Sequence, residues 1–486
     1  MAGIGEAGFA AADALLDEGA EVTVLDDSDD DRATERARVL EILGAAVRIG
    51  RGASAALPEG TDLVVASPGW RPTSPLLAGA VAQGVPVWSE VELAWRLQRP
   101  RADGSTVPWL AVTGTNGKTT TVRMLHAMLS AGGLRAAAVG NLGTPVVEAV
   151  RHPEPYDVLV VELSSFQLHY TGSLSAEAAV VLNLAPDHLD WHGSYDAYAA
   201  DKARIYERAQ VVCAYPLDDQ QVEQMVRDAE VAPGCRAVGF TTGVPPVGSV
   251  GVVDGVLADR AFVAGRDRQA AELAAVDDIA PLVQHPVAPH PVPPHLVANA
   301  LAAATMARAH GVPPAAVRAG LRAFRPDAHR IADVTPPDDP MRWVDDSKAT
   351  NPHAARASLQ GYDPVVWVAG GLAKQAGFDA LMIAVRDRLR GIVLLGTDRT
   401  ALAEAARRHA PDVPVIEVDG GETGAEVMDR VVEAAGRLAR PGDTVLLAPA
   451  CASQDQFGDY AARGDAFAAA VAARRGGRSG GGRPGG

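Results

Sequence analysis

Residues 114–120 read Gly114-Thr115-Asn116-Gly117-Lys118-Thr119-Thr120, and this stretch decides the fold. It follows the apolar run 109–112 and precedes the amphipathic stretch 122–131, which predicts a strand, a glycine-rich loop and a helix. Such a loop wraps backbone N–H groups around a polyphosphate, and its two glycines let the backbone close without Cβ clashes. We expect Lys118 to reach the terminal phosphates and the Thr119 hydroxyl to bind Mg²⁺. An ordinary strand–helix turn does not need this ordered motif, so the chain is predicted to bind ATP or GTP.

The composition is that of a multidomain globular protein. The chain has 486 residues, too many for one core, of which 48% are hydrophobic and 21% charged. Its net charge of −16 argues against a general nucleic-acid-binding protein, which needs a basic face. The three cysteines lie far apart in the sequence, with no metal-binding or disulfide pattern. Neither a signal peptide nor an apolar run of membrane-spanning length is recognised, so we expect a cytoplasmic protein without a membrane span.

The predicted fold class is α/β, in three domains that follow one another along the chain. Residues 1–98 alternate short apolar strands with helical stretches, which indicates a Rossmann-like layer. After a polar linker, residues 108–324 form a central P-loop-type ATPase domain, and residues 325–473 form a second Rossmann-like domain. The Pro/His-rich insertion 281–294 predicts an irregular loop. The Gly/Arg-rich tail 474–486 has nothing to bury and is expected to be disordered.

Two further polar residues follow strands of the central domain. Glu162 ends the apolar run 158–161, and His188 lies shortly after the run 179–183. The carboxyl ends of parallel strands meet at one edge of a sheet, so both residues should lie near the phosphate loop. Each residue alone is more often a cap or turn residue. Together, at the ends of strands in one nucleotide-binding fold, they favour a magnesium site.

These motifs and their order resemble those of the Mur ligase family. The resemblance covers almost the whole chain and rests on the phosphate loop and on three further motifs: Asn141-Leu142-Gly143, Glu162-Leu163-Ser164-Ser165-Phe166-Gln167 and Asp187-His188-Leu189-Asp190. It implies a three-domain ligase that consumes ATP in peptidoglycan precursor synthesis and works through an acyl phosphate.

The resemblance also implies an ATP site with two Mg²⁺ ions. The catalytic residues that it implies are Lys118, Glu162, His188 and Lys202, with Lys202 carbamylated. The metal ligands that it implies are Thr119, Glu162, His188 and the modified Lys202. The ATP contacts that it implies beyond the phosphate loop are Asn299, Arg330 and Asp346. Without the resemblance, Lys202 would be taken for a solvated helix lysine.

The C-terminal domain should determine which amino acid is added. Members of the family that add meso-diaminopimelate carry an Asp-Asn-Pro-Arg motif there, and this chain has none. It has instead Gly370-Gly371-Leu372-Ala373-Lys374 and the stretch 448–457, which resemble the D-glutamate-adding members. A lysine and two hydroxyls suit a dianionic amino acid. The D-glutamate contacts that the resemblance implies are Thr350, Lys374, Ser453 and Tyr460.

The N-terminal domain is expected to bind the UDP-sugar. Its stretch Gly3-Ile4-Gly5-Glu6-Ala7-Gly8 satisfies the pattern Gly-x-Gly-x-x-Gly, which read alone suggests NAD. In the family, the same helix N-terminus takes the UDP group. The contacts implied here are Gly5, Glu6, Ala7, Asp26, Ser67 and Asn141. The implied partners are UDP-N-acetylmuramoyl-L-alanine and D-glutamate, bound by a monomer.

Three positions depart from the family pattern. The chain starts at Met1, so the strand before the glycine loop is almost absent, and we expect it to be encoded upstream of a misassigned start codon. Leu296 stands where the family has an asparagine near the adenine. Tyr460 stands where relatives often have phenylalanine, and it can pack in the same way.

Three alternatives stay open. A folylpolyglutamate synthetase shares the phosphate loop and the chemistry, but it begins at the ATP-binding domain. A nucleotide-gated binding protein without catalysis is suggested by Leu296 and the short N-terminus, and opposed by the intact Lys118, Glu162, His188 and Lys202. A dehydrogenase that uses NAD rests on the glycine motif alone.

Overall fold

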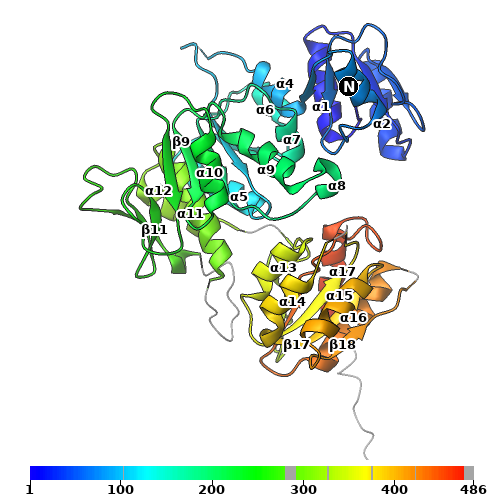
Figure 1. The fold of residues 1–486 in the computed structure, drawn as a ribbon, viewed down its shortest axis with the longest axis vertical. Coiled ribbons are helices and arrows are strands. Elements are labelled where there is room, and N and C mark those ends of the chain that lie inside the picture. Colours follow the sequence, from blue (N-terminus) through cyan, green and yellow to red (C-terminus); the bar gives the residue numbers. More distant parts are fainter. Residues whose placement is uncertain (102, 280–291, 326–327, 374–375, 422, 475–486) are drawn as a thin grey trace, which may run out of the picture. The chain divides into compact units, whose positions relative to one another are not determined.

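The computed structural model describes residues 1–101, 103–279, 292–325, 328–373, 376–421 and 423–474. Most of the Pro/His-rich insertion, Lys374 and the tail from residue 475 therefore lie outside the described residues. The chain divides into two compact units, which are described separately (Figure 1). The larger unit holds residues 1–275 and 298–324, and the smaller unit holds residues 276–297 and those from 325 onward. Both are α/β with mostly parallel sheets, as predicted.

The N-terminal layer of the larger unit is a small parallel sheet. Its strands are β1 (Thr23–Asp26), β2 (Ala46–Ile49), β3 (Val64–Ala66) and β4 (Val87–Ser89). Its helices are α1 (Glu6–Asp17), α2 (Asp31–Ile42), α3 (Pro75–Ala82) and α4 (Glu90–Arg96). Ala2 joins the strand pairs β1–β2 and β3–β4 through parallel bridges to Leu25 and Ala66. The strand expected before the glycine loop is thus reduced to the bridges of this single residue.

The central layer of the larger unit is a nine-stranded sheet in the order β13-β12-β11-β10-β9-β8-β5-β7-β6. Its strands are β5 (Trp109–Thr113), β6 (Ala136–Gly140), β7 (Val158–Glu162), β8 (Ala178–Val181), β9 (Val212–Pro216), β10 (Arg236–Phe240), β11 (Val250–Val253), β12 (Val256–Asp259) and β13 (Ala271–Ala275). Strands β5 to β11 pair in parallel, and β12 and β13 are antiparallel additions at the edge. All residues of β5, β7 and β8 are buried, as their apolar runs require in a sheet covered on both faces.

Helices cover both faces of this sheet (Figure 1). They are α5 (Lys118–Ala131), α6 (Val146–Val150), α7 (Ser165–His169), α8 (Leu189–His192), α9 (Tyr195–Ala203), α10 (Gln220–Asp228), α11 (Pro294–Ala309) and α12 (Pro314–Ala323). Because β5 lies between β7 and β8, the carboxyl ends of these three strands are adjacent. This order brings the phosphate loop, Glu162 and the residues after β8 to one edge of the sheet.

The smaller unit has a six-stranded sheet in the order β14-β15-β19-β16-β17-β18. Its strands are β14 (Ala332–Asp333), β15 (Arg342–Asp345), β16 (Val365–Gly370), β17 (Leu389–Leu395), β18 (Val415–Glu417) and β19 (Thr444–Leu447). Its helices are α13 (Pro352–Leu359), α14 (Asp379–Val385), α15 (Arg399–His409), α16 (Gly424–Leu438) and α17 (Tyr460–Ala473). All pairings are parallel except that of β14 with β15.

Two buried glutamates on α4 have pKa values that are shifted in opposite directions. The Glu90 carboxylate accepts a hydrogen bond from the backbone N–H of Val147 at 2.6 Å, but burial raises its pKa to about 7. Burial also acts to raise the pKa of Glu92, but donors from Ser173, Arg96 and Gly172 outweigh it, and the net shift is downward. The two side chains therefore respond to pH in opposite directions.

Glu90→Gln is expected to flatten the pH dependence of stability. The raised pKa means that the stabilising contribution of Glu90 is complete below its unfolded value near pH 4.5 and is lost as the pH rises toward 7. The wild type should lose about 3 kcal/mol of unfolding free energy across this window, and Glu90→Gln should lose much less. Thermal midpoints between pH 4.5 and 7 measure the effect. Glu92→Gln is the matched control, expected to destabilise the protein at pH 7; parallel curves for the wild type and Glu90→Gln would contradict the assignment.

Candidate active site

The phosphate loop lies between β5 and α5, as the sequence predicts. Gly117 is the N-cap residue of α5 and has a left-handed backbone with φ of +83°. Lys118 Nζ donates to the carbonyl oxygens of Gly114 at 2.9 Å and Thr115 at 3.0 Å. Thr119 follows in the first turn of the helix and is half-buried. The helix N-terminus and the lysine together provide positive potential for an anion.

Side chains from outside the motif fix the loop in place. Asn183, which follows β8, accepts from the backbone N–H of Asn116 at 2.9 Å and donates to its carbonyl at 3.0 Å. The Thr115 hydroxyl lies 2.8 Å from the Tyr198 hydroxyl and accepts from the backbone N–H of Ala185 at 3.0 Å. The sequence did not single out Asn183 or Tyr198. For Asn183, the sequence offered one indication, which is its position as a polar residue shortly after the apolar run of β8.

Gly117→Ala is expected to lower ligase activity by about tenfold or more, because the added Cβ displaces the side chain of Asn299, a predicted ATP contact. A Cβ atom at this position would clash with Asn299 Oδ1, and φ is left-handed. Gly133 is a matched control, since it has the same φ of +83° and a Cβ added there would meet no atom within 4 Å. Steady-state kinetics of Gly117→Ala and Gly133→Ala separate the contact from the backbone strain. Equal activity in the two variants would contradict the role of the contact.

Glu162 ends β7 beside the loop and is only 2% exposed. Its Oε1 accepts from Asn141 Nδ2 at 3.0 Å. Its Oε2 is buried, and no hydrogen-bond donor for it is found in the described parts of the chain. A buried carboxylate oxygen with no donor suits a cation ligand, and the donor set expected for Mg²⁺ is of this type.

Lys202 lies in α9 and is also 2% exposed, so it is not the solvated lysine that its sequence context alone suggests. Its Nζ donates to the carbonyl of Gly114 at 3.0 Å and to Thr113 Oγ1 at 3.3 Å. Burial holds the pKa of this amine well below its usual value, and the charge of Lys118 lowers it further. Nearby carboxylates, among them that of Glu162, act in the opposite direction. The structure thus brings Lys118, Glu162 and Lys202 into one electrostatic group.

His188 is held at the start of α8 in a left-handed conformation with φ of 52°. Its ring packs edge-on against Phe166, with 4.8 Å between ring centroids. Within the described residues, no three His, Cys, Asp or Glu side chains form a group that could hold a metal. Only two of the four predicted ligands, Glu162 and His188, are of these residue types. The other two are the Thr119 hydroxyl and the modified Lys202.

A buried polar chain, which the sequence did not reveal, holds α9 against α7 and α8. Ser165 Oγ lies 2.9 Å from His192 Nε2, and His192 Nδ1 lies 2.9 Å from Asp201 Oδ2. His169 Nδ1 contacts the same carboxylate at 2.9 Å. Burial would raise the pKa of Asp201, but the hydrogen bonds from the two imidazoles give a net lowering. Because Asp201 precedes Lys202, these hydrogen bonds hold in place the helix that carries the lysine.

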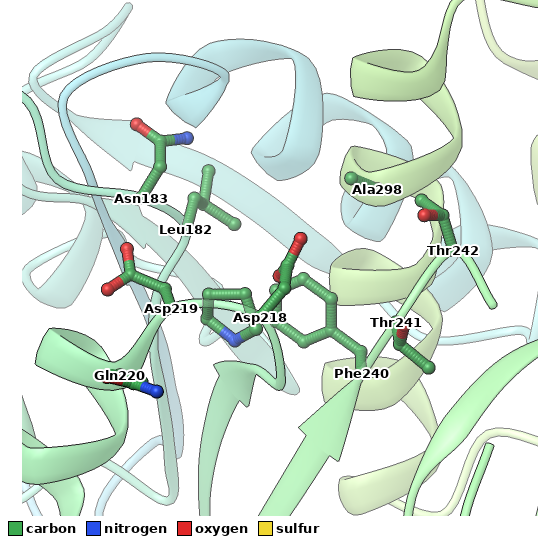
Figure 2. Close-up of a pocket in the computed structure, with 10 residues that line it drawn as sticks. Leu182, Asn183, Asp218, Asp219, Gln220, Phe240, Thr241, Thr242 and Ala298 are labelled. Atoms are coloured by element: carbon green, nitrogen blue, oxygen red, sulfur yellow. The ribbon is translucent and has the colours of Figure 1, made fainter.

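A cavity of about 490 Å³ lies beside Asn183, the residue that supports the phosphate loop (Figure 2). Its walls come from the segments after β8 and β9, from the end of β10 and from α11. The lining residues are Leu182, Asn183, Pro216, Asp218, Asp219, Gln220, Phe240, Thr241, Thr242 and Ala298. Asn183 thus both lines the cavity and accepts a hydrogen bond from Asn116 of the phosphate loop. Its volume is in the range of small-molecule sites.

A second cavity, of about 300 Å³, lies between the two layers of the larger unit. It collects five of the six residues predicted for the UDP-sugar, namely Gly5, Glu6, Ala7, Ser67 and Asn141. The sixth, Asp26, lies behind the glycine loop, where its Oδ2 accepts from the backbone N–H of Ile4 at 2.7 Å. Gln167 also lines the cavity, a residue that the sequence did not assign.

In the smaller unit, Asp346 and Arg330 lie near each other at the carboxyl end of β15. Burial raises the pKa of Asp346 to about 6, against a hydrogen bond from Ser358 and the charge of Arg330. The structure therefore brings together the two residues of this unit that were predicted to contact ATP.

The loops predicted to bind D-glutamate meet at the same sheet edge. The backbone N–H of Ala450 donates to the carbonyl of Ala349 at 2.9 Å, which joins the loop of Thr350 to that of Ser453. The Lys348 ammonium lies 3.6 Å from the centroid of the Tyr460 ring. Lys374 lies outside the described residues.

A buried arginine, unassigned from the sequence, ties these loops to α17. Arg463 is 1% exposed and donates to the hydroxyl and carbonyl of Ser347, both at 2.9 Å, and to the carbonyl of Cys451 at 3.2 Å. Cys451 itself is buried, and burial raises its pKa to about 12, so it is a packed thiol.

Known protein families and relatives match most of this chain. Residues 112–307 match the Mur ligase middle domain, and residues 329–451 match the Mur ligase glutamate ligase domain. A UDP-N-acetylmuramoylalanine--D-glutamate ligase of Streptomyces avermitilis is 58% identical to this chain over 97% of each. The chain belongs to the Mur ligase family. A ligase of the same name from Thermobifida fusca is 52% identical to this Mur ligase over 98% of each chain.

Solved structures share the fold of this Mur ligase at low identity. A UDP-N-acetylmuramate-alanine ligase from Thermotoga maritima aligns with a TM-score of 0.55 and 19% identity over 98% of each chain. The MurF ligase of Thermotoga maritima in complex with ADP aligns with a TM-score of 0.55 and 15% identity, over 94% of this chain and 98% of that one. These likenesses confirm the three-domain α/β fold class. In the described part of this Mur ligase, no helix combines the length and apolar character needed to cross a bilayer.

Proposed function

We propose that this Mur ligase uses ATP to form the amide bond between UDP-N-acetylmuramoyl-L-alanine and D-glutamate in peptidoglycan precursor synthesis. The observation that carries the proposal is the 58% identity, over 97% of both chains, to a relative named UDP-N-acetylmuramoylalanine--D-glutamate ligase. The matched domains and the phosphate loop support the same reaction.

The reaction needs activation because a carboxylate is a poor electrophile. The alanyl carboxylate attacks the γ-phosphorus of ATP, the bond to the β-phosphate oxygen breaks, and ADP leaves. The D-glutamate amine then attacks the acyl carbon, phosphate leaves, and the nitrogen loses a proton. Lys118 is positioned to exchange the carbonyls of Gly114 and Thr115 for phosphate oxygens, where its charge would stabilise the transferring group.

The residues around Glu162 suit the two Mg²⁺ ions that the resemblance to the family implies. The buried Oε2 of Glu162, for which the described residues offer no donor, supports a cation there. We assign Thr119 and Glu162 to one ion, and Glu162, His188 and the modified Lys202 to the other. When bound, Mg²⁺ supplies charge neutralisation on the phosphate oxygens.

Carbamylation of Lys202 is chemically reasonable at its position. Only a neutral amine attacks CO₂, and the lowered pKa of Lys202 favours the neutral form. The new N–C bond gives a carbamate, and the nitrogen releases a proton. The product is an anionic oxygen ligand in place of a buried cation.

The substrates are assigned to the cavities by their chemistry. We place the nucleotide base in the larger cavity next to Asn299, and the UDP group in the smaller cavity at the N-terminus of α1. Arg330 and Asp346 would contact ATP. The D-glutamate residues that we propose are Thr350, Lys374, Ser453 and Tyr460. We further propose that the three domains span residues 1–98, 108–324 and 325–473. The protein is proposed to be a cytoplasmic monomer.

Isotope transfer tests the acyl phosphate. UDP-N-acetylmuramoyl-L-alanine labelled with ¹⁸O in its alanyl carboxylate is incubated with ATP and D-glutamate. We expect one ¹⁸O atom in each phosphate released and one in the amide product. Phosphate without label would contradict the proposed activation.

A further inference from the structure

Cys213 and Cys235 lie side by side in the larger unit, although 22 positions separate them in the sequence. Cys213 is in β9 and Cys235 directly precedes β10, and these two strands pair in parallel. The two sulfur atoms are 3.9 Å apart. The spacing of the cysteines in the sequence gave no sign of this contact, because the pairing of β9 with β10 brings the two thiols together.

The two thiols differ in access. Cys213 is 2% exposed, whereas Cys235 is half-buried and open to small solutes. The hydrogen bond with Cys213 lowers the pKa of Cys235, which makes Cys235 the more nucleophilic of the two. Cys451, the third cysteine, is buried in the smaller unit.

We propose that Cys213 and Cys235 are a modification site, at which a hydroperoxide forms a reversible intrachain disulfide. The Cys235 thiolate attacks one peroxide oxygen and the O–O bond breaks; the leaving oxygen takes up a proton, and Cys235 becomes a sulfenic acid. The Cys213 sulfur then attacks the Cys235 sulfur, the S–O bond breaks, and water leaves with the thiol proton. The two sulfurs lose two electrons in total, and the peroxide gains them. The sulfurs must approach from 3.9 Å to about 2.05 Å, which side-chain rotation with a small strand shift can achieve.

The disulfide would close a ring that carries one wall of the larger cavity. The segment between the cysteines contributes Asp218, Asp219 and Gln220 to the lining, and β10 leads to Phe240 on the facing wall. The strand register places Cys213 opposite Ala237, two residues beyond Cys235, so joining the two sulfurs requires β10 to slide along β9, and this shift moves Phe240 relative to the facing wall. This consequence rests on the proposed nucleotide site, and we expect the dissociation constant for ADP to rise by about tenfold.

Peptide mapping tests the disulfide. The reduced full-length protein is treated with hydrogen peroxide, its free thiols are alkylated, and it is digested with trypsin, which separates the two cysteines into peptides 209–227 and 228–236. We expect these two peptides to be linked, and the link to disappear with dithiothreitol. In Cys213→Ala, dimedone should trap the sulfenic acid on Cys235, and Cys235→Ser should give no link. Unlinked peptides, or links to the Cys451 peptide as frequent as in urea-unfolded protein, would overturn the proposal.

Calorimetry with ADP tests the consequence for the cavity. Reduced and oxidised wild type are compared with Cys235→Ser under both treatments. We expect weaker binding only in the oxidised wild type. Linked peptides with unchanged ADP affinity would overturn the effect on the cavity. Absence of ADP binding by the reduced protein would instead count against the proposed nucleotide site, and the peptide map would still decide the disulfide.

Discussion

Lys118→Ala is expected to lower kcat by about a thousandfold or more while leaving the protein folded. The Lys118 ammonium spans the phosphate loop through the carbonyls of Gly114 and Thr115, where a terminal phosphate would take over its hydrogen bonds. Charge that develops on the transferring phosphoryl group would then lose its nearest fixed cation. The measurement is steady-state phosphate release, with circular dichroism to verify folding.

Arg123→Ala is the control for Lys118→Ala. Arg123 is on the same helix, α5, but its side chain is exposed, so its removal changes the net charge by the same amount at a position outside the phosphate loop. We expect it to keep most of the activity. A Lys118→Ala enzyme within about tenfold of the wild type would refute the phosphate role of the lysine.

Lys202→Ala is expected to reduce kcat by about a hundredfold or more, and small carboxylic acids should restore part of the activity. The substitution leaves space where the carbamate would lie, next to Thr113 and Gly114. Formate or acetate can occupy this space and supply an anionic oxygen.

Lys202→Arg sharpens this test, because it keeps a cation but cannot form the carbamate. It should be inactive and should not respond to formate, since the arginine fills the space. Wild-type enzyme prepared without CO₂ should regain activity when bicarbonate is added. Full activity of Lys202→Ala, or its failure to respond to any small acid, would count against the modification.

The parts of the fold that the sequence predicted are those with a local cause. Glycines at 114 and 117 and the apolar run before them define the phosphate loop without reference to distant residues. The buried parallel strands were recognisable as continuous apolar runs. The short strands β2 and β14 were missed, because exposed or two-residue strands carry no such run.

The residues that were missed depend on pairing between distant segments. Asn183 reaches the phosphate loop because β8 lies next to β5 in the sheet. Tyr198 reaches the same loop from α9, where its hydroxyl contacts that of Thr115. The burial of Lys202 has the same origin, and its helical context gave no sign of it. Arg463 looks like an ordinary helix arginine until α17 packs on the loops of the smaller unit.

The most direct test of the proposed function is phosphate release from ATP with UDP-N-acetylmuramoyl-L-alanine and a panel of amino acids: D-glutamate, L-glutamate, L-lysine, meso-diaminopimelate and L-alanine. A D-glutamate ligase should release phosphate with D-glutamate alone, together with one amide product per phosphate. Release with another amino acid in place of D-glutamate, or no release with any of the five, would contradict this function.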